Sequence, residues 1–135
     1  MATSRASRNV DVVRTAYEAF NRGDIEGVLE TLGEDIEWIE PEGSHYRGIH
    51  RGHDAVVRGV FAQNAEDVDG FEAGIDRIIE DGDSVVTIGT TSGTFRSSGR
   101  QFEIPFAHVL EMQDGHVVRF QNYTDTYTWH EAAAE

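Results

Sequence analysis

The sequence QFEIPFAHVLEMQDGHVVRFQNYTD, residues 101–125, decides the fold because it predicts two long strands joined by a tight turn. Asp114-Gly115 is a strong signal for a two-residue hairpin loop. Across 101–113, apolar residues alternate with more polar ones, so one face of this strand is directed at an interior. That face carries Phe102, Ile104, Phe106, His108, Leu110 and Met112.

The two-residue loop also predicts how the strands pair, beginning with Gln113 opposite His116. Regular pairing then places His108 opposite Gln121. A bulge would shift every partner by one residue. The pairs further from the turn are Phe106 with Tyr123 and Ile104 with Asp125.

Polar side chains therefore converge on an otherwise apolar face that must also meet the helices. A single histidine on such a face is more often a core residue whose ring is satisfied by hydrogen bonds. Burying several polar groups without water or a ligand is unfavourable, which favours a pocket over a filled core. The converging side chains are those of His108, Gln121, Tyr123 and Asp125.

The remaining periodicities predict three helices and three further strands before the hairpin. Helices followed by a meander of strands indicate an α+β domain with helices packed on one face of a curved sheet. We expect one domain over residues 9–135, preceded by a small, polar and disordered tail over residues 1–8. The predicted helices are 9–21, 24–32 and 53–64, and the predicted strands are 36–40, 71–80 and 84–95.

A second group of interest ends the first predicted strand, where Glu40 precedes Pro41. Trp38 and Glu40 share one face of that strand because side chains alternate. A carboxyl group beside an indole at the edge of an interior is expected to have a raised pKa and to suit acid–base chemistry. The alternative is a solvated acid at a strand end.

Composition restricts the classes of partner. The 135 residues carry 25 acidic and 11 basic side chains, all of the latter arginine, for a formal net charge of −14. Such a charge repels nucleic acid and anionic membranes, so neither is an expected partner. High acid content without lysine also resembles the acidic surfaces of proteins from salt-loving organisms. No apolar run is long enough to span a bilayer, and we expect a soluble, cytoplasmic protein.

Other chemistries find little support in the sequence. The absence of cysteine excludes disulfides and thiolate metal ligands. His50 and Asp54 have the spacing of a helical ligand pair, but Gly52 interrupts them, so we expect no metal. We find no nucleophile motif and no phosphate-binding loop, and expect no cofactor. His45 and His53 are expected to be solvated loop histidines.

Five short motifs, taken together, resemble the nuclear transport factor 2-like superfamily in its ketosteroid isomerase and SnoaL-like branch. The resemblance covers about Val10 to Tyr127. It implies a cone-shaped α+β barrel, in which a strongly curved, mixed but mostly antiparallel sheet and three helices enclose a pocket. It also implies a homodimer. The motifs are YEAFNRGD at 17–24, WIEP at 38–41, YRG at 46–48, DGHVV at 114–118 and NYTD at 122–125.

The resemblance assigns roles to particular positions. Glu40 falls on the position of the isomerases' general base. Tyr17 lies about one residue from their oxyanion tyrosine. The position of the partner acid falls on His108, or on Ala107 if the hairpin loop is aligned without a gap. SnoaL-like polyketide cyclases use a carboxylate on the late strands beside a pocket histidine, a pattern that Asp125 and His108 match. The Arg-x-Asp pair of the related epoxide hydrolases is absent from 106–108.

We therefore expect a cofactor-independent isomerase, cyclase or dehydratase that acts on a small apolar molecule. Glu40 or Asp125 would be the base, with His108 as proton donor or orienting partner. The alternative is a ligand-binding or dimeric interaction module without catalytic activity. The residues expected to contact the substrate are Tyr17, Phe20, Trp38, Tyr46, Phe61, Phe106, Gln121 and Tyr123.

Overall fold

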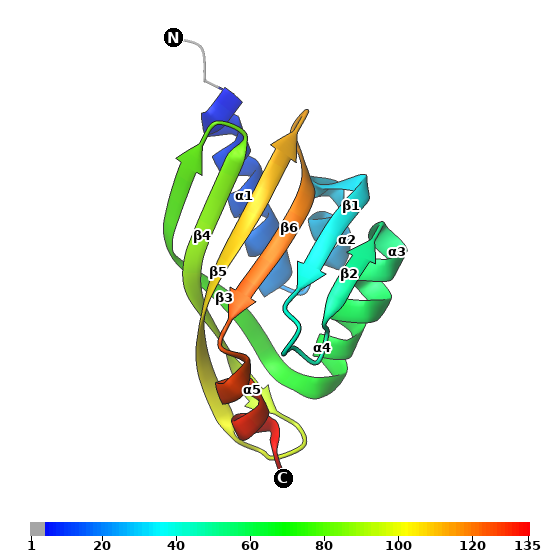
Figure 1. The fold of residues 1–135 in the computed structure, drawn as a ribbon, viewed down its shortest axis with the longest axis vertical. Helices are drawn as coiled ribbons and strands as arrows, with labels where there is room; N and C mark the ends of the chain where they lie inside the picture. The colour runs from blue at the N-terminus through cyan, green and yellow to red at the C-terminus, as the bar shows by residue number, and fades with distance from the viewer. Residues whose placement is uncertain (1–4) are drawn as a thin grey trace.

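The computed structural model describes residues 5–135, which form six strands and a set of helices (Figure 1). The strands are β1 (Leu32–Glu40), β2 (Gly48–Arg51), β3 (Val68–Asp81), β4 (Ser84–Phe95), β5 (Gln101–Gln113) and β6 (His116–Thr124). The helices are α1 (Arg5–Asn21), α2 (Ile25–Thr31), α3 (His53–Val56), the π-helix η1 (Val57–Phe61), α4 (Ala62–Asp67) and α5 (Thr126–Ala133).

Helix α1 begins at Arg5, which corrects the predicted boundary between tail and domain at residue 9. Residues 1–4 of the expected tail lie outside the described residues. Strand β2 is a further correction, because it is not among the strands predicted from the sequence. None of the helices in the described part of the chain is long and apolar enough to cross a membrane.

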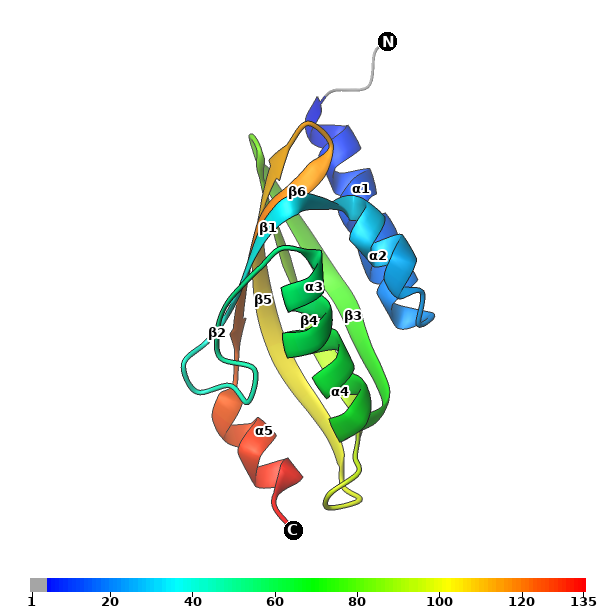
Figure 2. The same cartoon turned by 90° about the vertical axis from the view of Figure 1, so that its right-hand side faces the viewer.

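All six strands form one sheet with the order β2-β1-β6-β5-β4-β3. Strands β1 and β6 are parallel and the other neighbours are antiparallel. Helices α1 and α2 and the segment from α3 to α4 cover one face of the sheet, whereas no helix formed by residues 5–135 covers the other (Figure 2). This arrangement confirms the expected α+β fold with a strongly curved, mixed sheet.

The curvature of the sheet depends on close backbone approach between β3 and β4. A side chain at Gly89 would collide with the carbonyl oxygen of Gly74 in the neighbouring strand. The pairing of the two strands also shifts between Ile75 and Arg77, which marks a bulge. Glycine and a bulge together allow the strands to bend around the helices.

A second bulge corrects the predicted register of the hairpin. Gln113 pairs with His116 as predicted, but Glu111 pairs with Arg119 while Met112 pairs with Val117. The extra residue on β6 is Val118. Beyond it every partner moves by one position, so the pairs are His108 with Asn122 and Phe106 with Thr124.

The shift of register exchanges the two faces of β6. Asn122 and Thr124 now lie on the inner face of the sheet. Gln121 and Tyr123, which alternate with them along β6, point away from the helices. Strand β6 ends at Thr124, because Asp125 is the N-cap of α5. The polar residue opposite His108 is consequently an asparagine.

Candidate functional site

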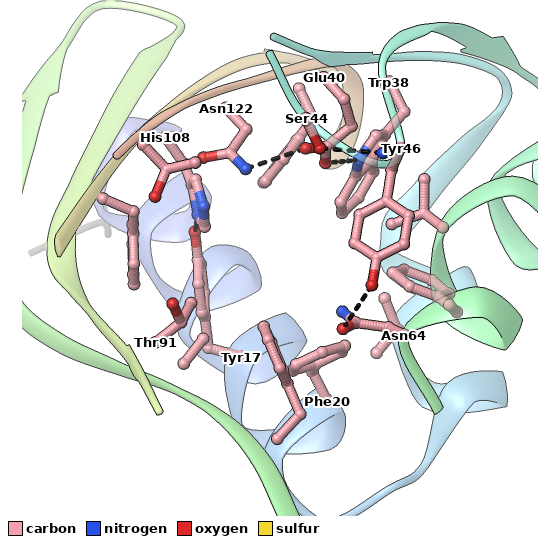
Figure 3. Close-up of a pocket in the computed structure, with 18 of the residues that line it drawn as sticks. Tyr17, Phe20, Trp38, Glu40, Ser44, Tyr46, Asn64, Thr91, His108 and Asn122 are labelled. Carbon is pink, nitrogen blue, oxygen red and sulfur yellow. Dashed lines mark hydrogen bonds between the residues drawn. The ribbon is translucent and has the colours of Figure 1, made fainter. Parts of the chain in front are cut away.

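A cavity of about 110 Å³ lies between the inner face of the sheet and the helices (Figure 3). Its walls come from nearly every element and are mostly aromatic or aliphatic. Eight of the residues predicted for the site line it, which makes the converging face a pocket rather than a filled core. They are Tyr17, Phe20, Trp38, Glu40, Tyr46, Phe61, Phe106 and His108.

Glu40 is the acidic group of this cavity and closes β1 at its last residue. Its side chain is only 6% exposed, so the prediction of a solvated acid is wrong. Trp38 Nε1 donates to its Oε2 at 2.8 Å, and Asn122 Nδ2 donates to its Oε1 at 3.0 Å. Burial raises the pKa of Glu40, and these two bonds and the charge of His50 only partly oppose it.

His108 lies on the wall formed by β5 and is equally enclosed. The Tyr17 hydroxyl lies 2.5 Å from its Nδ1 and 2.6 Å from Thr87 Oγ1. Burial lowers the pKa of His108 to about 3, and the side chain of Asn122 acts weakly in the opposite direction. Loss of solvation penalises the charged ring, so His108 is neutral at pH 7.

Counting hydrogens fixes the tautomer of this neutral ring. Thr87 is fully buried, and within the described residues its hydroxyl meets only the Tyr17 oxygen. A buried hydroxyl left without an acceptor is costly, so Thr87 donates to Tyr17. Tyr17 must then donate to Nδ1 of His108, which leaves the ring proton on Nε2. His108 is thus a neutral hydrogen-bond donor at the cavity, comparable to a polarising imidazole in other enzymes.

Tyr46 connects the loop after β1 to helix α4. Its hydroxyl donates to Asp67 Oδ2 at 3.0 Å and reaches Asn64 Oδ1 at 3.4 Å. Burial and the neighbouring charge of Asp67 raise the pKa of Tyr46. The tyrosine therefore stays protonated and holds this loop against the helices.

Asp125 does not belong to the cavity, which corrects its predicted catalytic role. It is the N-cap of α5, and its carboxylate accepts from the Thr128 backbone N–H at 3.0 Å and from the Thr128 hydroxyl at 2.6 Å. These bonds lower the pKa of this exposed carboxylate. A capping carboxylate turned to solvent cannot reach a ligand in the cavity.

Two predicted contacts, Gln121 and Tyr123, are also misplaced, because the bulge turns them to the outer face. Tyr123 is 52% exposed. The residue that sequence reasoning missed is Asn122, which lies between Glu40 and His108. The same alternation would have found it, had the one-residue bulge at Val118 been located.

His50 lies in β2 and His53 begins α3, so the expectation of a solvated loop position is wrong for His53, and both rings form hydrogen bonds to the backbone. His50 Nε2 lies 2.8 Å from the carbonyl oxygen of Tyr46, and His53 Nε2 lies 3.0 Å from that of Leu32. Among residues 5–135, no three side chains of His, Asp or Glu are grouped so that they could hold a metal ion.

Comparison with known proteins agrees with this geometry. A family model described as a SnoaL-like domain matches residues 13–120. The chain belongs to the SnoaL-like domain family. A structure of an NTF2-like protein from Burkholderia thailandensis is 33% identical, and the match covers 94% of this chain and 98% of that chain with a TM-score of 0.89. No curated protein matches the chain.

Two other similar structures were determined with small molecules. TerC, co-crystallised with polyporic acid, is 30% identical; the match covers 96% of this chain and 100% of TerC, with a TM-score of 0.88. A protein with a ketosteroid isomerase-like fold from Catenulispora acidiphila was crystallised with trimethylamine. It is 14% identical, with 91% of this chain and 92% of that chain covered and a TM-score of 0.79, which shows the fold alone.

Proposed function

We propose that this protein is a cofactor-independent enzyme that moves a proton on a small, apolar carbonyl compound. The observation that carries the proposal is Glu40, a carboxyl group with a raised pKa on the wall of an apolar cavity. General bases work best when their pKa lies near the working pH. Isomerisation, cyclisation and dehydration all begin with such a proton transfer.

The proposed first step is the removal of a C–H proton next to the carbonyl group. Glu40 takes the proton, and the C–H electron pair forms the enolate, whose negative charge lies on the carbonyl oxygen. His108 Nε2–H donates a hydrogen bond to this oxygen, supported through Nδ1 by Tyr17. Glu40 then returns the proton, to another carbon in an isomerisation.

The neighbours of Glu40 hold it in place for this step. Trp38 and Asn122 each bind one carboxylate oxygen, so the carboxylate cannot rotate freely. A cavity of about 110 Å³ is below the usual range for drug-sized ligands and suits a compound of about one ring. The polyporic acid and trimethylamine found with similar proteins support a small-molecule ligand.

The test compares two carboxylates that the structure places differently. Cyclic and aryl ketones are incubated with the protein in D₂O, and NMR follows the exchange of hydrogen next to the carbonyl group. We expect Glu40→Gln to slow exchange by about 10²- to 10⁴-fold, and the exposed Asp125→Asn to leave it unchanged. Exchange that survives in Glu40→Gln contradicts the proposed base.

The competing proposal is a ligand-binding module without catalysis. Glu40 would then serve only to orient a ligand, as would Tyr17 and His108. Calorimetry separates the two proposals, because a binding module takes up ketones without exchanging their hydrogens. Binding without exchange across the whole pH range from 5 to 8 would favour the module.

We also propose that the uncovered face of the sheet forms a homodimer. One row of paired residues crosses all six strands on this face and is apolar except at Gln121. Ile49 and Ile79 at its two ends are 51% and 37% exposed. The row reads Ile79, Val86, Val109, Gln121, Ile39 and Ile49.

Light scattering tests this dimer. Val109→Glu places a charge at the middle of the row and should give a monomer with an intact cavity. Exposed apolar faces of this kind are typical of interfaces. A native protein that is monomeric at micromolar concentration would overturn the proposal.

A further inference from the structure

Two side chains of the cavity wall each carry a buried polar atom without a partner among the described residues, namely Asn122 Oδ1 and Trp129 Nε1. Oδ1 of Asn122 is buried and accepts no hydrogen bond from the described residues. Nδ2 of the same amide donates to Glu40 Oε1 at 3.0 Å. In the ionised form in which Glu40 would act as a base, its carboxylate can only accept, so in that form this contact fixes which end of the amide is the nitrogen.

The free acceptor lies next to a free donor. Nδ1 of His108 is occupied by Tyr17, so Nε2 is the ring nitrogen left to face the Asn122 amide, and it does not meet Asn122 Oδ1 with the geometry of a hydrogen bond. Asn122 and His108 are also directly paired across β5 and β6. The cavity wall thus presents an acceptor, Asn122 Oδ1, beside a donor, His108 Nε2–H.

A carbonyl group satisfies only half of this pair. Its oxygen accepts from His108 Nε2–H but leaves Asn122 Oδ1 unpaired, with two acceptor oxygens close together. A neighbouring hydroxyl group on the ligand would donate to Asn122 Oδ1 and remove that cost. Buried acceptors are nearly always paired, so an unpaired one in a ligand cavity indicates what the ligand must supply.

We propose that the cavity selects hydroxy-carbonyl compounds, in which a hydroxyl group neighbours the carbonyl oxygen, and that Asn122 is the residue that recognises the hydroxyl. This inference rests on the proposed function for the position of the carbonyl group. It adds the substrate class. Asn122 then has two tasks, because one end of its amide holds the base and the other binds the substrate.

Three neutral probes of about the same size separate the interactions. α-Hydroxyacetophenone carries the donor, α-methoxyacetophenone keeps the oxygen without its hydrogen, and acetophenone lacks the group. Calorimetry at pH 7 measures the dissociation constant of each. We expect the hydroxy compound to bind on the order of tenfold more tightly than either of the others, since a neutral hydrogen bond to a buried, otherwise unpaired acceptor has about that effect.

The variants assign the preference to one atom. Asn122→Leu keeps the volume of the side chain and removes the acceptor, and Asn122→Ala is the second variant in case the leucine protein unfolds. In either variant the three probes should bind within about twofold of one another. The control is Gln121→Leu, which removes a carboxamide from the next residue of β6 on the outer face and should keep the tenfold preference.

Any of four outcomes would overturn the inference, and the first three concern the whole set of probes or the variants. They are equal binding of the three probes to the native protein, no binding of any probe, and a preference that survives in both Asn122 variants. A methoxy compound that binds as tightly as the hydroxy compound would also do so, because a bound water would then be sufficient as donor. The experiment measures binding alone. Its result can therefore be interpreted even if the exchange assay shows that Glu40 is not the base.

Discussion

The buried, neutral His108 makes the stability of the protein depend on pH in a way that can be measured. Its ring is 7% exposed and its folded-state pKa is about 3. In the unfolded chain a histidine has a pKa of about 6.5. Below pH 6.5 the unfolded state therefore binds a proton that the folded state does not, and stability falls as pH falls.

The magnitude follows from the two pKa values. One proton corresponds to about 1.4 kcal/mol for each pH unit between the unfolded and folded pKa. From pH 7 to pH 5 this contributes a loss of about 2 kcal/mol from His108 alone. Glu40 has a raised pKa, so its contribution to stability changes with pH in the opposite direction. Because Glu40 is present in all the proteins compared, this contribution cancels in the comparison.

The assay is urea unfolding of three proteins at pH 7 and pH 5. His108→Gln retains a partner for the Tyr17 hydroxyl and cannot be protonated, so its unfolding free energy should fall by about 2 kcal/mol less than that of the native protein. His116→Gln removes an exposed histidine and should behave as the native protein does. If native protein and His108→Gln lose the same free energy between pH 7 and pH 5, the ring is not kept neutral by burial and the tautomer argument fails.

Two further predictions concern elements that support the cavity without lining it. Asp125→Ala removes the N-cap of α5 and should destabilise the protein by about 1 kcal/mol in thermal unfolding, with ketone binding unchanged; weakened binding would mean that Asp125 does contact the ligand. Gly59 lies in the π-helix, and Gly59→Ala would place a methyl group against the ring of His50 in β2. The substitution should lower the free energy of unfolding by about 1–3 kcal/mol. Its control is Gly33→Ala, whose new carbon would have an ordinary contact of 3.5 Å with Val118 and should change stability little.

Local patterns were sufficient to predict the fold. Alternation in β5, the Asp114-Gly115 turn and the helical spacing of apolar residues each depend on neighbours a few positions apart. The same patterns placed Glu40 beside Trp38 on the inner face, and the structure adds that the two side chains are hydrogen-bonded. Family resemblance supplied the closure of the pocket, which periodicity does not predict.

The errors at Gln121, Tyr123 and Asn122 arise from one inserted residue. A strand has a period of two, so the bulge at Val118 moves Gln121 and Tyr123 to the outer face and brings Asn122 inside. No residue type in HVVRF signals a bulge, because valine suits either position in a strand. Asp125 was misplaced for a related reason, since its role as N-cap appears only when β6 ends at Thr124.

The cavity chemistry follows from burial acting on two groups of opposite type. Loss of solvation raises the pKa of Glu40 and lowers that of His108, so the uncharged form of each is favoured. Proton transfer from a ketone to Glu40 removes the charge from the carboxylate and places it on the substrate oxygen. That oxygen meets His108 Nε2–H, which Thr87 and Tyr17 hold in the donor tautomer. The burial that makes Glu40 a stronger base would equally penalise the enolate, and this donor is the group that offsets the penalty. A reaction in this cavity therefore requires both Glu40 as the base and His108 as the donor. Removing the Tyr17 hydroxyl should impair turnover more than ligand binding.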